Sequence, residues 1–256
     1  MSRFFGFNTI LVSSALALGF MALATPAAAA ARIVVINGDG PGEGFNDPTP
    51  AAPVGANSGT TKGQQRLIAF QFAADLWGLT LDSTVEIRVL AQFSSLGANV
   101  LGSAGAASIF SDFPGILPGF PGAAFVDTWY HSALADKRAG ADLAELFGFP
   151  NDPDIVANFS SDFDFYLGLD NQHGAQIDLV TVVLHELAHG LGFANFVNEA
   201  TGANIGGQTD IFSHYTLDTT NNTLWSSFAP GATGNAARAA SALRVDKIVW
   251  NGPNVD

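Results

Sequence analysis

Apolar and polar positions alternate with regular spacing in several parts of the chain, and their order predicts a layered α/β fold. Residues 32–37 (RIVVIN) are β-branched, and residues 85–93 (VEIRVLAQF) alternate apolar with polar side chains, so both stretches are predicted strands. Between them, apolar positions recur at helical spacing over residues 62–77, and we expect Gly78 to end that helix.

The second half of the chain continues this alternation of elements. We expect a strand at residues 126–130 and a helix at residues 133–147 that ends at Gly148, whereas residues 94–125 show no clear pattern. Residues 176–191 carry a broad apolar face and form the strongest predicted helix. The order of these elements predicts an α/β (α+β) domain with a mixed sheet and packed helices.

The N-terminus has the pattern of an export signal. Arg3 supplies a basic start, an apolar stretch follows, and an alanine run ends the segment. We therefore expect residues 1–30 to be a cleaved signal peptide and residues 31–256 to be one secreted domain, extracellular or periplasmic. The finish at WNGPNVD, just after a strand-like stretch, suggests a natural chain that continues beyond residue 256.

Composition excludes several functional classes. The formal net charge is −13, which disfavours nucleic acid and anionic membrane surfaces as partners, because both are bound by Lys and Arg. The chain has no cysteine, so disulfides, thiolate metal ligands and a cysteine nucleophile are all excluded. Stability must come from the core, and bound ions are an additional option.

The predicted helix at residues 176–191 contains the pattern H-E-x-x-H. His185 and His189 stand one turn apart on one face, where two imidazole nitrogens can bind one zinc ion. Glu186 lies about 100° around the helix, so it can act as general base on a zinc-activated water without ligating the metal. The alternative is that both histidines are ordinary helix residues satisfied by backbone or carboxylate partners.

The stretch IDLVTVVLHELAHGLGF resembles the active-site helix of the zincin metallopeptidases. Together with GQTDIF and VWNGPNV, it resembles a metzincin-like group of exported bacterial proteins that often carry a protease-associated domain insert. The resemblance implies a zincin-like fold with a twisted mixed sheet, a Zn²⁺ cofactor and the hydrolysis of protein or peptide substrates.

Two features depart from the metzincin pattern and leave the third zinc ligand open. Asn195 occupies the position of the third metzincin histidine, and both methionines lie within residues 1–30, so no methionine turn is possible. Asp210 is the preferred ligand, because its separation from His189 resembles that of the carboxylate ligand in thermolysin-like enzymes. Glu199 and His214 are the other candidates.

The sequence therefore predicts a secreted zinc-dependent endopeptidase with His185, His189 and Asp210 as metal ligands and Glu186 as general base. One alternative is a catalytically inactive binding protein that keeps the fold. Another is a zinc hydrolase acting on a non-peptide amide or ester. Two acidic clusters offer oxygen ligands suited to structural Ca²⁺, although solvated turns are the simpler interpretation: Asp39/Glu43/Asp47 and Asp152/Asp154/Asp162/Asp164.

Overall fold

The computed structural model describes residues 30–253. The predicted signal peptide, residues 1–30, lies outside the described residues except for its last position. Within residues 30–253, no helix combines the length and apolar character needed to cross a bilayer.

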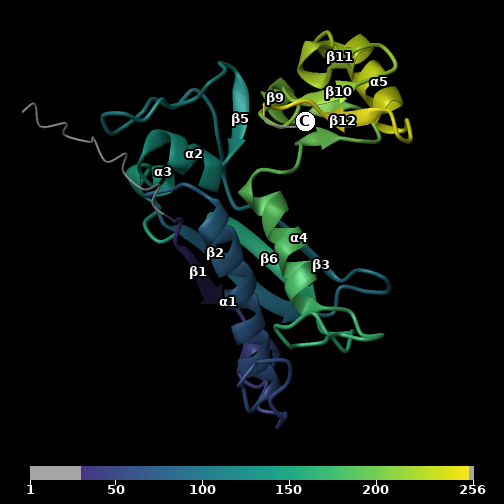
Figure 1. Ribbon diagram of the computed structural model, residues 1–256. Helices are drawn as coiled ribbons and strands as arrows, with labels where there is room; N and C mark the ends of the chain where they lie inside the picture. Colours follow the sequence, from purple (N-terminus) through teal and green to yellow (C-terminus); the bar gives the residue numbers. More distant parts are fainter. Residues whose placement is uncertain (1–29, 254–256) are drawn as a thin grey trace, which may run out of the picture.

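A four-stranded mixed sheet forms the centre of the molecule (Figure 1). Its order is β1 (Ile33–Asn37), β2 (Ile87–Ser94), β6 (Ile155–Ser160) and β3 (Gly102–Ala106). The first three strands run parallel, whereas β3 pairs antiparallel with β6 and forms one edge of the sheet. The predicted α/β class and mixed sheet are thereby confirmed, and β3 lies in the stretch where the sequence showed no pattern.

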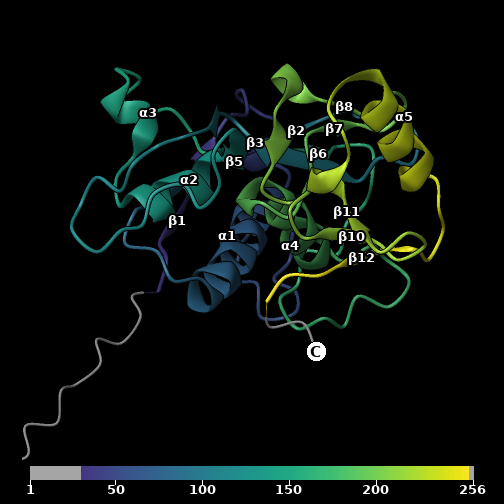
Figure 2. The same cartoon turned by 90° about the horizontal axis from the view of Figure 1, so that it is seen from above.

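Two helices, α1 (Lys62–Thr80) and α4 (Leu179–Leu191), lie side by side on one face of this sheet (Figures 1 and 2). Between helices and sheet lies the main hydrophobic core, in which Phe70, Phe159 and Leu187 are fully buried. Phe159 meets Phe70 edge-on at 5.4 Å between ring centroids. The apolar side chains that recur at regular spacing in the sequence therefore form the contact between the helices and the sheet.

Helix α1 corrects one detail of the sequence prediction. Thr61 caps its start by accepting a hydrogen bond from the Gln64 amide, but the helix continues past Gly78 to Thr80. A Cβ at position 78 would lie 2.5 Å from the Ala31 carbonyl oxygen. Glycine is therefore needed here because the chain before β1 passes directly against the helix, and not because the helix ends.

The single helix predicted for residues 133–147 is wrong, because the structure has two short helices, α2 (Ser132–Ala139) and α3 (Leu143–Leu146). Gly140 ends α2 in the left-handed conformation, with φ 75°, and the Asp142 carboxylate caps the start of α3. Preceding α2, β5 (Thr128–His131) pairs with β4 (Ile109–Phe110) and, in parallel, with β9 (Thr209–Asp210).

The chain after α4 forms a separate set of short elements at the C-terminal end of that helix (Figure 1). They are the hairpin β7 (Val197–Asn198) and β8 (Ala203–Asn204), the small sheet of β10 (Thr216–Asp218), β11 (Thr223–Leu224) and β12 (Ile248–Trp250), and helix α5 (Gly231–Ala242). Three 3-10 turns complete the structure: η1 (Gly44–Asn46), η2 (Ile205–Gly207) and η3 (Trp225–Ser227).

Candidate metal centre

Helix α4 carries the H-E-x-x-H residues, and local signals define its ends. Asp178 is the N-cap and its carboxylate accepts hydrogen bonds from the Thr181 amide and hydroxyl, at 2.8 and 2.6 Å. Gly192 follows the last helical residue with φ 123°. The helix thus begins three residues later than predicted and ends where the sequence indicated.

The side chains of His185 and His189 converge above the last turns of α4. Their Nε2 atoms are 3.2 Å apart, and the two rings are perpendicular with centroids at 4.8 Å. Two nitrogens that each lie about 2.0–2.1 Å from one tetrahedral zinc ion are separated by roughly 3.3–3.4 Å. The pair therefore already has nearly the spacing of two ligands to one ion.

A backbone carbonyl fixes the orientation of the second histidine. Nδ1 of His189 lies 2.9 Å from the carbonyl oxygen of Phe193, which follows the helix. Because a carbonyl oxygen only accepts, Nδ1 carries the proton and Nε2 keeps its lone pair. This is the arrangement by which metal-binding histidines are usually oriented.

Glu186 lies on the side of α4 that faces the edge strand β3. Its side chain is half-buried, and its Cγ atom lies 3.0 Å from the position that a Cβ of Gly102 would occupy. The absence of a side chain at the start of β3 thus lets the strand pass beside this carboxylate. Glu186 and the histidine pair consequently share one end of the helix.

The structure does not bring Asp210 to the two histidines. Within residues 30–253, no group of three His, Cys, Asp or Glu side chains is arranged to hold a metal ion. Asp210 is 1% exposed and accepts hydrogen bonds from the Phe196 amide and from the amide and hydroxyl of Ser213. Burial raises the pKa of Asp210, and these hydrogen bonds oppose the rise. In this conformation Asp210 fastens the segment after α4 to β9.

The other candidate ligands also lie apart from the histidine pair. Glu199 is exposed in the turn between β7 and β8, and the Asn195 side chain accepts a hydrogen bond from the Val197 amide. The His214 ring stacks on Phe125 with 4.0 Å between centroids. Burial lowers the pKa of His214, while the carboxylate of Asp210 opposes this effect.

His131 is a neighbour of the site that the sequence did not indicate. The side chain is 1% exposed, its ring stacks on Phe196 at 4.4 Å, and its Nδ1 atom has no hydrogen-bond partner. Burial and the nearby His189 lower the pKa of His131 to about 4, so the ring is neutral at neutral pH. A lone histidine between a strand and a helix gives no sequence signal, because only folding brings β5 to the end of α4.

An open apolar cleft adjoins the histidine pair. It has a volume of about 570 Å³, and both histidines form part of its wall together with Trp77, Leu81, Ala188, Leu191, Gly192 and Phe193. The Trp77 indole donates a hydrogen bond to the Leu184 carbonyl, which ties the end of α1 to α4. A ligand held at the histidines would therefore lie against apolar side chains.

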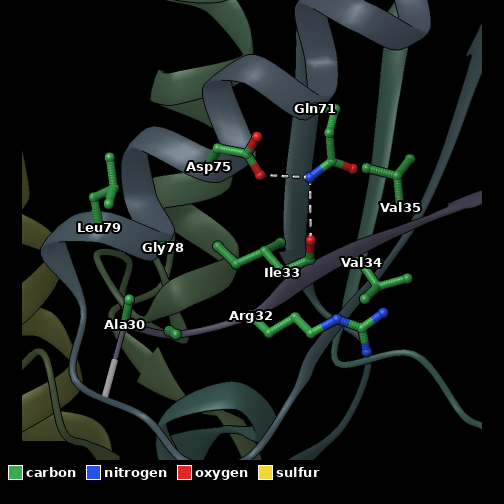
Figure 3. Close-up of a pocket in the computed structure, with 10 residues that line it drawn as sticks. Ala30, Arg32, Ile33, Val34, Val35, Gln71, Asp75, Gly78 and Leu79 are labelled. Carbon is green, nitrogen blue, oxygen red and sulfur yellow. Dashed lines mark hydrogen bonds between the residues drawn. The ribbon is translucent and has the colours of Figure 1, made fainter. Parts of the chain in front are cut away.

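A second groove, of about 600 Å³, runs between β1 and α1 (Figure 3). Gln71 spans it by donating hydrogen bonds to the Asp75 carboxylate and to the Ile33 carbonyl. No histidine lines this groove, and Arg32 and Asp75 are its charged residues. This groove is therefore not a candidate metal site, despite its size.

Three of the acidic residues considered for calcium, Asp39, Asp47 and Asp154, have structural partners. The Asp39 carboxylate accepts hydrogen bonds from the amides of Phe45 and Phe93, and Asp154 accepts one from the Arg88 amide. Asp47 lies 3.6 Å from Arg66. These carboxylates connect the loops around the sheet to β2 and α1.

Comparison of the chain with protein-family models, with curated proteins and with solved structures found no match.

Proposed function

We propose that this protein is a secreted zinc-dependent endopeptidase of the zincin class. The observation that carries the proposal is the convergence of the His185 and His189 Nε2 atoms at 3.2 Å, with Nδ1 of His189 engaged by the Phe193 carbonyl. Two imidazoles whose Nε2 atoms converge on one point are suited to a divalent cation such as Zn²⁺.

The roles of the chain's own groups follow from their positions. Zinc supplies a Lewis acid that brings the pKa of a water molecule towards about 7. Glu186 would accept the proton of the attacking water as general base and return it to the leaving amine. The Phe193 carbonyl holds His189 in orientation, and the apolar cleft gives the substrate an apolar wall beside the histidines.

The edge strand favours a peptide over another amide or ester as substrate. Among residues 30–253, β3 pairs only with β6 and leaves its second edge without a strand, and it passes beside Glu186 at Gly102. An extended peptide can pair with such an edge through its backbone. A scissile bond presented in this way would lie close to the general base.

A third zinc ligand can be supplied only if part of the chain moves towards the two histidines. The segment after Gly192 carries Glu199, Asp210 and His214, and a shift of this segment on metal binding would be needed for any of them to join the pair. This gives a second candidate function some support, namely a zincin-fold binding protein without catalysis, because no third His, Cys, Asp or Glu in the described part of the chain is arranged with the two histidines to hold one ion.

Replacement of Glu186 by Gln separates these possibilities. We expect Glu186→Gln to keep the zinc content of the wild-type protein while cleavage of casein falls by about 10²-fold or more. Glu145→Gln, which changes an acid of α3, is the matched control and should cleave normally. Less than half an equivalent of zinc in the wild-type protein, with no cleavage, would favour the binding protein.

Alanine variants of the two histidines test the proposed metal centre separately. His185→Ala and His189→Ala should each lose zinc, whereas His173→Ala, a change in an exposed loop before α4, should retain it. Zinc content that is unchanged in both variants would refute the proposed centre. Cleavage of an ester but not of casein or peptides would identify the non-peptide hydrolase instead.

A further inference from the structure

A pocket in the C-terminal part of the chain contains a single, buried base and no acid. It has a volume of about 310 Å³ and is lined by residues of β8, η2, β9, η3 and α5, namely Asn204, Gly207, Thr209, Ser226, Phe228, Pro230, Gly231, Asn235 and Arg238. Arg238 is its one charged residue, and no Asp or Glu belongs to this lining. The pocket around Arg138 is also free of acids, but Arg138 is only partly buried, whereas Arg238 is buried.

Arg238 is 3% exposed, yet its charge has no carboxylate in contact. Its Nε donates to the Gly202 carbonyl at 2.8 Å and its Nη2 to the Asn235 side-chain oxygen at 2.5 Å. Within residues 30–253, Nη1 has no acceptor and no Asp or Glu lies within 4.0 Å of the guanidinium. Asp210 is the nearby acid, and its oxygens are occupied by Phe196 and Ser213. A buried guanidinium with only neutral partners favours the binding of an anion.

Further unpaired groups surround the same pocket. The Asn204 Oδ1 and Thr209 Oγ1 atoms are buried without a hydrogen-bond partner. Helix α5 begins at Gly231, also in the pocket wall, and Pro230 before it supplies no side-chain cap for the free amides of the first turn. The Thr209 hydroxyl and the free amides of this turn can donate to an anion, whereas Asn204 Oδ1 only accepts and contributes nothing to anion binding.

From this arrangement we infer that the pocket binds a small organic carboxylate. The planar guanidinium of Arg238 matches a carboxylate in shape and charge, and the uncapped start of α5 adds donors for the same group. Phe228 and Pro230 offer an apolar wall to the remainder of the ligand. The volume is at the lower end of the range for small-molecule sites, which excludes a macromolecule inside the pocket. This site is distinct from His185 and His189 and does not depend on the proposed hydrolase activity.

The inference is tested by calorimetric titration of the full chain with butyrate and, separately, with inorganic phosphate at equal ionic strength. We expect butyrate to bind saturably at one site with millimolar affinity and phosphate to bind at least about tenfold more weakly. The absence of saturable butyrate binding would overturn the inference. Tighter binding of phosphate than of butyrate would overturn the assignment to a carboxylate.

A matched pair of variants locates the binding. Gly207 has φ 79°, a conformation that Asn and Asp tolerate best, and a Cβ there would meet no atom within 4 Å. Gly207→Asp places a negative charge at the pocket, whereas Gly207→Asn has the same shape without the charge. We expect Gly207→Asp to weaken butyrate binding by about tenfold or more relative to Gly207→Asn. Equal affinities would show that the anion binds elsewhere.

A second variant tests the guanidinium directly. Arg238→Lys keeps the positive charge but loses the planar fork, so butyrate binding should weaken while circular dichroism confirms the fold. Unchanged affinity in a folded Arg238→Lys protein would contradict the role of Arg238. If that variant does not fold, the pair at position 207 still decides the inference.

Discussion

The two parts of the molecule on either side of Gly192 are stabilised by different kinds of interaction. Up to α4, the fully buried side chains are mostly apolar and lie between the sheet and two helices, such as Phe70, Ile155 and Phe159. After α4, polar and charged residues dominate the buried set, which consists of Asp210, Ser213, Thr216, Asp218, Arg238 and Ser241 beside Val197, Ile211 and Trp225.

The two kinds of interaction have different effects: one stabilises the fold as a whole, and the other fixes the geometry of particular sites. Apolar packing tolerates no voids but has little directionality, whereas buried hydrogen bonds fix the positions of particular atoms. The first part therefore supplies a rigid base for α4, and the second part supplies a loop network that can hold ligands. Both candidate sites, the histidine pair and the Arg238 pocket, lie where the second part begins or within it.

The largest expected effect is a loss of stability caused by a substitution in the core of the part before Gly192. Phe159→Ala removes a fully buried ring that contacts Phe70 and Phe93 in the core. The free energy of unfolding should fall by about 3–5 kcal/mol, as measured by urea denaturation. A loss below about 1 kcal/mol would show that apolar packing does not dominate here.

Asp210→Asn tests the hydrogen-bond network of the second part. The amide cannot accept all the bonds from Phe196 and Ser213, so stability should fall by about 1–3 kcal/mol. Because Asp210 is occupied in this way, we expect the zinc content to stay unchanged. Asp246→Asn, the same substitution at an exposed residue, is the control. Loss of zinc with unchanged stability would instead identify Asp210 as a metal ligand.

Gly78→Ala tests the close approach of the chain to α1. Alanine favours a helix, but its Cβ would lie 2.5 Å from the Ala31 carbonyl oxygen, so we expect a loss of about 1–2 kcal/mol. Gly105→Ala is the matched control in β3, because a Cβ there meets nothing within 4 Å. Its effect should be within about 0.5 kcal/mol. Equal behaviour of both variants in thermal unfolding would contradict the packing argument.

An effect that depends on pH concerns a buried carboxyl pair, Asp136 and Asp154. Burial and the hydrogen bond with Asp154 raise the pKa of Asp136 to about 8, from the usual 3.8. The folded state therefore keeps a proton that the unfolded chain loses above about pH 4. This contribution to stability is fully present below pH 3.8 and is lost as the pH rises through about 8.

Asp136→Asn should remove this dependence. Between pH 5 and 9, the unfolding temperature of the wild-type protein should decrease more than that of Asp136→Asn. Asp152→Asn, a change at an exposed residue, should behave like the wild type. A wild-type unfolding temperature that rises over this range would contradict the assigned direction of the pKa shift.

The sequence determined the elements whose side chains repeat with a regular period. The strands β1, β2 and β5 and the helices α1 and α4 were predicted within a few residues, because each has one face in the core. His185, Glu186 and His189 were placed on one helix by their spacing alone. In contrast, β3 is rich in Gly, Ala and Ser, so its pairing with β6 left no apolar pattern in the sequence.

Tertiary structure decided everything that depends on residues far apart in the chain. Only the folded chain shows that Asp210 is occupied by Phe196 and Ser213, that His131 lies beside His189, and that Arg238 faces a pocket without an acid. Periodicity reports which side of an element is buried, whereas the partner of a buried polar group is set by loops whose conformation has no period.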